Sequence, residues 1–231
     1  MGVDPEDFAF NGAHGDDVWL TAADASGKLV RFADHVEFGA AANGESFGRW
    51  PNGSGELYPQ AELTLDAQNS GPRVGPVVIS EVHYNPLDPQ DGLPVNELEF
   101  VELYNPLTMD TDLTNWRFGA GVSFDFANGL QLPAGGTLVV VSFNPTDVHK
   151  LTRFRAYYGI DASVSIVGPY SGVLDNGVET IRLERPDESP FDEPDFIPYL
   201  LEDEFRYEDD PPWPAEPDGT GPSLTRVGAT A

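Results

Sequence analysis

Cysteine is absent from this chain of 231 residues, which excludes disulfides, thiolate nucleophiles and cysteine-ligated metals. Basic residues are scarce: 12 Lys and Arg, of which only Lys28 and Lys150 are lysines, stand against 39 Asp and Glu. The formal net charge of −27 repels phosphate groups and anionic lipid headgroups, so we expect no nucleic acid among the partners. No apolar run reaches about 18 residues, so we expect no insertion into a membrane.

Histidine pairs and phosphate-binding loops, two patterns that carry catalysis, are also missing. The histidines occur singly, without the paired spacing typical of a metal-dependent active site; they are His14, His35, His83 and His149. No glycine-rich loop of the kind that binds phosphates is present. We therefore expect that this protein is not an enzyme.

Glycine and proline, in contrast, are plentiful. The chain contains 24 Gly and 21 Pro, which suits many short strands joined by turns. The run over residues 145–158 is an exception, because its apolar residues recur at helical spacing. We expect one helix there, with Asn144 as its N-cap, Pro145 in its first turn and Gly159 at its end.

Short apolar or alternating runs bounded by Asn, Pro or Gly predict strands in the rest of the chain. From residue 76 onward we expect them at 77–84, 97–104, 113–118, 122–126, 137–143, 163–167, 178–184, 195–200 and 223–227. Four motifs stand out here: Ile79-Ser-Glu-Val82, Phe100-Val-Glu-Leu-Tyr-Asn105, Asn115-Trp-Arg117 and the apolar run from Leu132 to Val141. In order and spacing they resemble the lamin tail domain. The resemblance implies an all-β fold, an immunoglobulin-like antiparallel β-sandwich with one short inserted helix.

The resemblance also implies a kind of function. Lamin tail domains are usually non-catalytic modules, which bind proteins and DNA in nuclear lamins and occur in secreted or surface proteins of bacteria. The acidity of this chain argues against DNA. We expect a bacterial, secreted or cell-surface module for adhesion, assembly or spacing, whose partners are other domains of its parent protein or surface proteins. The opening residues lack the regions of a signal peptide, so we expect the chain to begin inside a longer protein.

The two ends of the chain resemble each other in the order of their features. Each has a strand, an acidic turn, a second strand and a glycine-rich approach to a Ser-x-x-Arg sequence, at Ser46 to Arg49 and at Ser223 to Arg226. A tandem array predicts this pattern: residues 1–50 would be the C-terminal strands of a preceding unit, 51–75 a linker, and 76–231 one complete unit. The alternative is that the N-terminal strands pack onto the complete unit. Their unpaired edges would favour such docking or self-association.

Acidic residues on neighbouring strands suggest a cation site. Alternation places Ile79, Glu81 and His83 on one side of their strand, and Glu102 on the same side of its strand as Phe100. If the two strands pair, the carboxylates meet and need a proton, a cation or an arginine such as Arg117 between them. Structural pairing or solvation is the simpler interpretation. We expect no cofactor, with Ca²⁺ as the alternative; its ligands would be Glu81, Glu102, Asn105, Asp110 and Asp112.

Aromatic residues suggest a second kind of site. Trp116 is expected in the core of the sandwich. Trp213 lies in a proline-rich acidic segment and is expected to pack against the sandwich. If Trp213 and Tyr170 were exposed instead, they would form a platform for a glycan. The alternative function is thus a carbohydrate-binding accessory module of a secreted hydrolase.

Overall fold

The computed structural model describes residues 9–227, which divide into two compact units. The first, called here the N-terminal unit, contains the residues up to Arg73 together with Pro186–Leu201. The second, called the sandwich unit, contains Val74–Arg185 and the residues from Glu202 onward. Within residues 9–227, no helix combines the length and the apolar character needed to cross a membrane.

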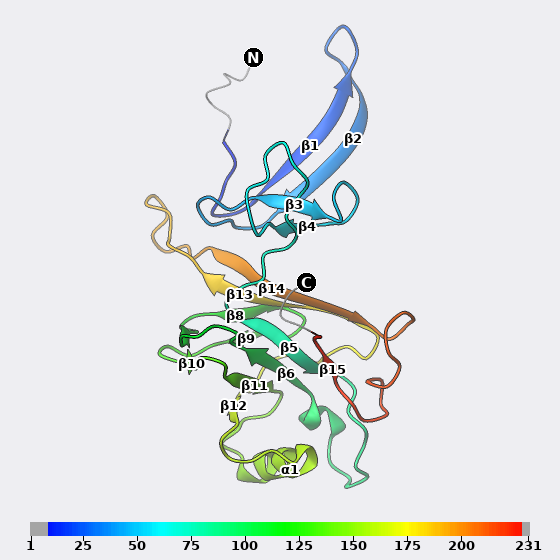
Figure 1. The fold of residues 1–231 in the computed structure, drawn as a ribbon, viewed down its shortest axis with the longest axis vertical. Helices are drawn as coiled ribbons and strands as arrows, with labels where there is room; N and C mark the ends of the chain where they lie inside the picture. The colour runs from blue at the N-terminus through cyan, green and yellow to red at the C-terminus, as the bar shows by residue number, and fades with distance from the viewer. Residues whose placement is uncertain (1–8, 228–231) are drawn as a thin grey trace. The chain divides into compact units, whose positions relative to one another are not determined.

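The sandwich unit is built on two main sheets (Figure 1). The first contains, in spatial order, β12 (Ser165–Val167), β11 (Thr137–Val141), β6 (Phe100–Tyr104), β5 (Val78–His83) and β15 (Leu224–Thr225). The second contains β14 (Tyr199–Glu208), β13 (Val178–Pro186), β8 (Arg117–Ala120) and β9 (Phe124–Asp125). A small ribbon pairs β10 (Gln131–Leu132) with β7 (Thr111–Asp112). Neighbours in the first sheet are antiparallel, except that β11 and β12 are parallel. The expected all-β, immunoglobulin-like class is confirmed.

The main hydrophobic core, called here the sandwich core, lies between these two sheets. Val101 and Leu103 of β6 are fully buried in it, as are Ile181 and Leu183 from the second sheet. Trp116 is 6% exposed and belongs to the same cluster, which confirms its expected place. Because one side of each strand faces this core, the apolar residues recur at every second position.

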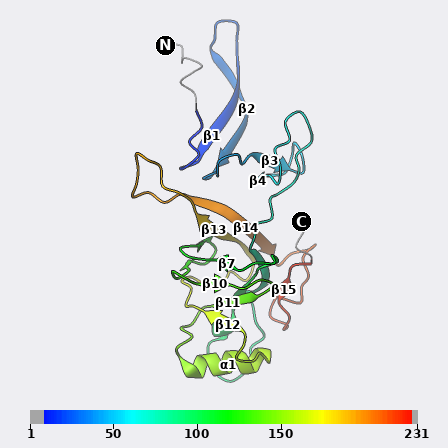
Figure 2. The same ribbon diagram turned by 60° about the vertical axis from the view of Figure 1, so that its left-hand side comes forward.

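A second core, called here the helix-side core, covers the opposite face of the first sheet. It joins Phe100, Val139 and Val141 of the sheet to Phe154 of the single α-helix, α1 (Val148–Tyr158). Figures 1 and 2 both show α1 beside the end of this sheet formed by β11 and β12. Since β11 is buried on both faces, its residues 138–141, Leu-Val-Val-Val, are continuously apolar and do not alternate.

The expected start of the helix was wrong. The N-cap is Asp147, whose carboxylate accepts hydrogen bonds from the backbone N–H groups of His149 and Lys150, at 3.0 and 3.3 Å. Asn144 instead forms its own turn, in which its side-chain oxygen accepts from the Thr146 N–H at 2.9 Å. The helix ends as expected at Gly159, where φ is +65°, a conformation that favours glycine.

Two expected strands were also misplaced. The segment Leu113–Trp116 is a turn, closed by a bond from the Trp116 N–H to the Leu113 carbonyl, and the strand β8 begins only at Arg117. The residues before Tyr199 likewise form turns, so β14 begins later than the expected 195–200 and continues to Glu208. In both places turn hydrogen bonds replace the ladder that the apolar residues suggested.

The N-terminal unit has a different character. Its β1 (Asp16–Ala23) and β2 (Leu29–Phe38) form an antiparallel ribbon, and β3 (Phe47–Trp50) pairs with β4 (Glu56–Pro59). Figures 1 and 2 show the ribbon extending from β3 and β4 as a two-stranded arm. Among the described residues of this unit, Leu200 is the only large hydrophobic residue whose side chain is buried.

This grouping differs from the expected division in two places. Residues 51–75, expected as a linker, contain β4. Gln60, next to this strand, is buried, and its side-chain amide donates a hydrogen bond to the Gly48 carbonyl at 2.9 Å. Residues 186–201, expected within the complete unit, group with the N-terminal unit. There Phe196 stacks on His14 with ring centroids 3.9 Å apart, and Glu193 lies 2.7 Å from the same imidazole.

Candidate functional site

The two acidic strand residues lie close together as expected, but the strand before Glu81 contains an irregularity that simple alternation does not predict. Glu81 and Glu102 lie directly opposite each other in the antiparallel pair of β5 and β6. The expectation that Ile79 shares a side with Glu81 was wrong, because a β-bulge adds Ser80 between them. Ile79 and Val82 therefore both face the sandwich core, and the carboxylates lie on the other face.

Hydroxyl groups bind both carboxylates. Ser80 donates to Glu102 Oε1 at 2.7 Å, and Ser223 donates to Glu81 Oε1. Burial raises the pKa of Glu102, and the Glu81 carboxylate raises it further against the opposing effect of the Ser80 hydrogen bond. Arg117, the expected counter-ion, forms an ion pair with Glu184 at 2.7 Å.

The other expected cation ligands lie in separate turns. Asn105 is buried and donates to the carbonyl groups of Met109 and Leu132, at 2.9 and 3.0 Å. Asp110 accepts from the Ala134 N–H, and Asp112 accepts from both donors of Thr114. Among residues 9–227, no three His, Asp or Glu side chains are grouped so that they could hold a metal ion. The structure therefore brings together Glu81 and Glu102 alone out of the five expected ligands.

His83 occupies the helix side of β5 without exposure to solvent. Its Nδ1 lies 2.7 Å from the Tyr158 hydroxyl, which itself donates to the Leu98 carbonyl at 2.6 Å. The hydroxyl must then accept, so Nδ1 carries the proton and Nε2 is left with a buried lone pair that has no partner among the described residues. Burial lowers the pKa of His83 to about 4, so the imidazole is neutral at physiological pH.

A cavity of about 550 Å³ opens at the end of β5. Its wall comes from three segments: the end of β5, the short 3₁₀-helix η2 (Val95–Leu98), and the turn before β13. The lining residues are Asn85, Pro86, Val95, Asn96, Glu99, Val173, Leu174, Asp175 and Asn176. Four of them bear amide or carboxylate oxygens in addition to Glu99, so the cavity combines polar acceptors with a few apolar contacts.

Glu99 is the buried acid of this cavity, and it was not among the expected site residues. It is 5% exposed, and its Oε2 accepts from the Tyr170 hydroxyl at 3.1 Å and from the Leu174 N–H at 3.4 Å. Burial raises the pKa of Glu99 to about 7, although these two hydrogen bonds oppose the shift. The signal was present in the sequence, because Glu99 alternates with Val101 and Leu103 and so falls on the buried side of the strand.

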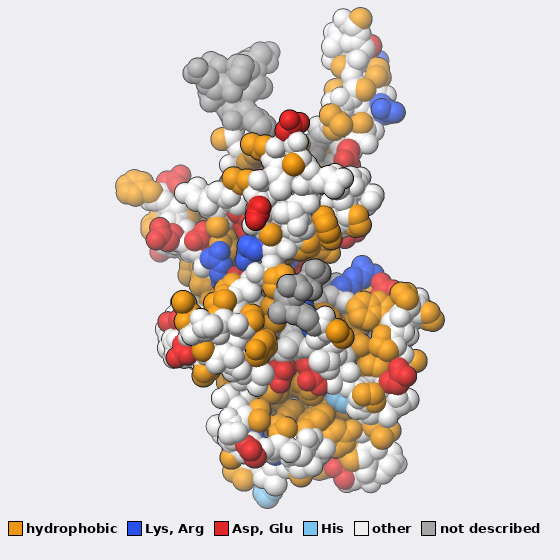
Figure 3. Space-filling view, in the orientation of Figure 1, with side chains coloured by type: hydrophobic (Ala, Val, Ile, Leu, Met, Phe, Trp, Pro, Cys, Tyr) orange, Lys and Arg blue, Asp and Glu red, His pale blue; other side chains and the backbone are white. Residues whose placement is uncertain are grey.

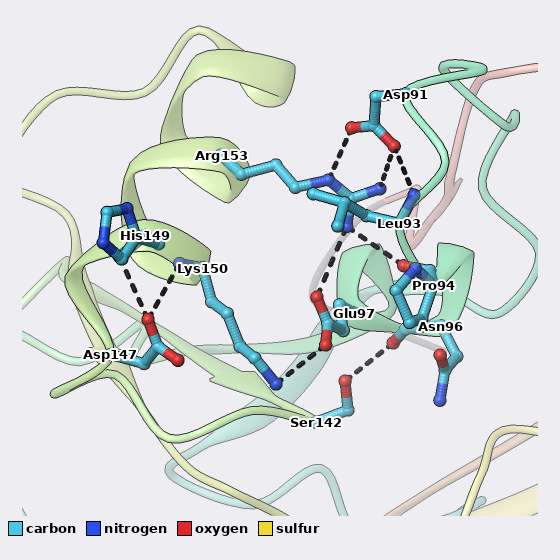
Figure 4. Close-up of polar contacts among 10 residues, drawn as sticks. All are labelled: Asp91, Leu93, Pro94, Asn96, Glu97, Ser142, Asp147, His149, Lys150 and Arg153. Atoms are coloured by element: carbon cyan, nitrogen blue, oxygen red, sulfur yellow. Dashed lines mark hydrogen bonds and ion pairs between the residues drawn. The ribbon is translucent and has the colours of Figure 1, made fainter.

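Ion pairs from α1 hold the η2 wall of the cavity in place (Figure 4). Arg153 binds Asp91 through two nitrogens, at 2.7 and 3.1 Å, and donates to the Pro94 carbonyl at 3.0 Å. Lys150 reaches Glu97 at 2.7 Å. Because these bonds join the helix to η2 and to the loop directly before it, the inserted helix fixes the η2 wall of the cavity.

We expect Arg153→Ala to loosen this wall without unfolding the sandwich. The Arg153 side chain is 12% exposed, so its loss removes a shielded bidentate pair and should lower stability by about 1–2 kcal/mol. Hydrogen exchange of the Leu93 amide, which donates to Asp91, should speed up much more than exchange in β6. Lys150→Ala is the control, because that side chain is 40% exposed and should contribute less than about 1 kcal/mol. Equal exchange rates at Leu93 in the two variants would contradict the role given to Arg153.

The two aromatic residues expected at a glycan platform lie inward. Tyr170 is 4% exposed, because its ring belongs to the sandwich core and its hydroxyl meets Glu99. Trp213 is partly buried and packs against that core, edge-on to Phe205 with ring centroids 6.2 Å apart. This arrangement differs from the alternative of an exposed platform and agrees with the expectation that Trp213 packs on the sandwich.

The sequence Gly44-Glu-Ser-Phe-Gly48 has the spacing of a hydrolase nucleophile elbow. Such an elbow requires a serine on a sharp turn from a strand into a helix. Here Ser46 precedes β3, which pairs with β4 as an antiparallel strand. The spacing therefore lacks the structural context that its chemistry needs.

A family model described as Lamin Tail Domain matches residues 70–193, more than half of the 231 residues. The chain belongs to the lamin tail domain family. Lamin tail domains are immunoglobulin-like modules without catalytic activity, in agreement with a binding or structural role. The match includes β5, β6 and every residue that lines the cavity around Glu99. No curated protein sequence matches the chain.

Proposed function

We propose that this lamin tail protein is a non-catalytic binding and structural module of a bacterial secreted or cell-surface multidomain protein, used for adhesion, assembly or spacing. In this proposal the sandwich unit is one complete repeat, and the N-terminal strands are the C-terminal part of a preceding repeat. The observation that carries the proposal is an ion pair that occurs twice, once in each unit.

The ion pair joins a Ser-x-x-Arg strand to the second strand of the ribbon before it. In the sandwich unit, Arg226 Nη2 lies 2.9 Å from Asp203 Oδ2 on β14. In the N-terminal unit, Arg49 Nη2 lies 3.3 Å from Asp34 Oδ1 on β2. Since the order of strand, strand and Ser-x-x-Arg is also shared, β1, β2 and β3 correspond to β13, β14 and β15.

The two copies differ in what covers them. In the sandwich unit, Ile181 and Leu183 of β13 are fully buried under the first sheet. In the N-terminal unit, the apolar side chains of the ribbon are open to solvent: Trp19 is 52% exposed, Leu20 63% and Phe32 67%. Figure 3 shows hydrophobic side chains along the visible face of this arm. A lone two-stranded ribbon with little core is at most marginally stable, which supports a covering layer from another repeat.

Self-association through the ribbon tests this proposal. With the apolar face uncovered, we expect the protein to dimerise in sedimentation velocity as its concentration rises. The double variant Trp19→Ser with Phe32→Ser should raise the dimer dissociation constant at least about tenfold, because buried aromatic anchors dominate interface energies. Leu63→Ser with Leu65→Ser is the matched control, since these leucines are 64% and 93% exposed outside the ribbon.

Two results would count against the proposal. One is a dissociation constant that changes equally in the ribbon variant and in the control. The other is hydrolysis of a glycoside or ester by the wild-type protein that is lost in Glu102→Gln, because such a loss would assign a catalytic role to the carboxylate pair.

A further inference from the structure

The cavity around Glu99 contains a buried carboxyl group with hydrogen bonds to only one of its two oxygens. Both donors, the Tyr170 hydroxyl and the Leu174 N–H, bind Oε2, and Oε1 has no hydrogen-bond partner among the described residues. Glu99 is more than nine-tenths buried and lines the cavity. Oε1 is not one of the described side-chain atoms that are closed off from solvent without a partner, so it remains open to a ligand that enters the cavity.

The electrostatic surroundings favour a positively charged ligand. None of the lining residues is basic, and Asp175 adds a second carboxylate to the wall. Glu179 lies near enough to raise the pKa of Glu99 further. The other titratable groups that interact with Glu99 are tyrosines, which are uncharged at neutral pH; they are Tyr158, Tyr170 and Tyr207.

The geometry selects among cations. A metal ion is disfavoured, because the described residues provide no group of three His, Asp or Glu ligands. A guanidinium binds best to both oxygens of a carboxylate, but Oε2 of Glu99 already has two donors. An ammonium group needs one strong acceptor and a few neutral ones. Glu99 Oε1 is the strong acceptor, and the residues that line the same cavity include Asn85, Asn96 and Asn176, whose side chains bear neutral amide oxygens.

The remaining lining residues fit an alkyl chain. Pro86, Val95 and Leu174 offer apolar surface beside the polar groups. A lysine side chain has this combination, since its methylene stem packs on apolar surface and its charged end binds acceptors. None of the lining residues is aromatic, so the stacking surface that a sugar ring requires is missing from the cavity.

We propose that this cavity binds a primary ammonium group on an alkyl chain, namely the lysine side chain of a protein partner. The chain has a formal net charge of −27, and a lysine-bearing partner would complement this negative charge. The inference does not depend on the repeat arrangement proposed above, because all the residues involved lie within the sandwich unit.

Carbon-detected NMR of the Glu99 carboxyl group tests this inference on the full chain. Saturation with n-butylammonium chloride should lower the pKa of Glu99 by about one unit or more, because an adjacent cation favours the ionised form. Tetramethylammonium chloride at the same ionic strength should leave it unchanged, since that cation donates no hydrogen bonds. The blocked peptide acetyl-Gly-Lys-Gly-amide should act like n-butylammonium, and its Nε-acetyllysine form should not.

Substitutions locate the site. Glu99→Gln should weaken n-butylammonium binding at least about tenfold, the loss expected when one charge-assisted hydrogen bond is removed. Asp112→Asn is the matched control, because this exposed acid lies outside the cavity. The dissociation constant of n-butylammonium for this variant should stay within about twofold of the wild-type value. Equal shifts with n-butylammonium and tetramethylammonium, or undiminished binding by Glu99→Gln, would overturn the proposal. Binding of n-butylammonium without binding of the lysine peptide would overturn the assignment to a protein partner.

Discussion

Replacing Arg226 by alanine is expected to lower the free energy of unfolding of the sandwich unit by about 3 kcal/mol. The ion pair between Arg226 and Asp203 is shielded, with side chains that are 21% and 9% exposed. The same carboxylate accepts from the Ile79 N–H at 2.7 Å, so it cannot turn to solvent without breaking a bond to β5. Without the guanidinium, the carboxylate must stay unpaired or take up a proton, and both outcomes oppose folding.

The repeated ion pair provides the control for this prediction. Arg49→Ala removes the corresponding pair in the N-terminal unit, where the side chains are 30% and 59% exposed, and should change stability by less than about 1 kcal/mol. Native-state hydrogen exchange of amides in β6 and β11 measures the stability of the sandwich unit separately. If these amides exchanged no faster in Arg226→Ala than in the wild type, the stabilising role of the ion pair between Arg226 and Asp203 would be refuted.

The second large effect is expected at Glu99, where glutamine should raise the free energy of unfolding at about pH 8 by on the order of 3 kcal/mol. The pKa of this carboxyl group is about 7 in the folded protein against an ordinary value of 4.5. The folded state therefore binds more protons than the unfolded state between these two values. Stability must fall as pH rises through this window, and the full loss is present above about pH 7.

Glutamine keeps the shape of the protonated acid and cannot ionise. Urea unfolding of the wild type and of Glu99→Gln at a series of pH values should give curves that nearly coincide near pH 4.5 and separate toward alkaline pH. Glu102→Gln is a useful comparison, because burial raises its pKa in the same direction within the same sheet. Parallel pH profiles for Glu99→Gln and wild type would contradict the assigned ionisation.

Strand positions near residue 80 show what alternation in the sequence can and cannot predict. The apolar runs located β5, β6 and β11 correctly, since each must present every second side chain to a core. Alternation also placed Glu102 on the correct face. It failed at Ile79, which lies on the opposite face from Glu81, because a bulge depends on how two strands align, and Ser80 has no feature in the sequence that marks an extra residue.

Helix and turn boundaries were less predictable for a different reason. Both Asn144 and Asp147 are good N-cap residues, and Asn-Pro is a common way to begin a helix. The structure uses Asp147 because a turn formed by Asn144 comes first. Both residues can cap a helix, so the local sequence alone does not decide which of them does.

The candidate site was missed for a reason that lies in long-range packing. The expected site residues were acids and aromatics that looked conspicuous in loops, such as Asp110, Asp112 and Trp213. Glu99 acquires its hydrogen bonds from Tyr170 and Leu174, more than seventy residues away in sequence, and its raised pKa from its burial in the folded chain. No local pattern reports such an encounter, although the position of Glu99 on the buried side of its strand was a usable signal.

The inserted helix has an evolutionary consequence. Phe100, Val139 and Val141 face α1 and would meet water if the helix were deleted. A relative that lacks the inserted helix must then carry polar residues at these three positions. Otherwise it would expose a hydrophobic sheet face and aggregate. The helix and the hydrophobic residues beneath it must accordingly be inherited together. Whether these three strand positions are apolar or polar therefore indicates whether a given relative retains the helix.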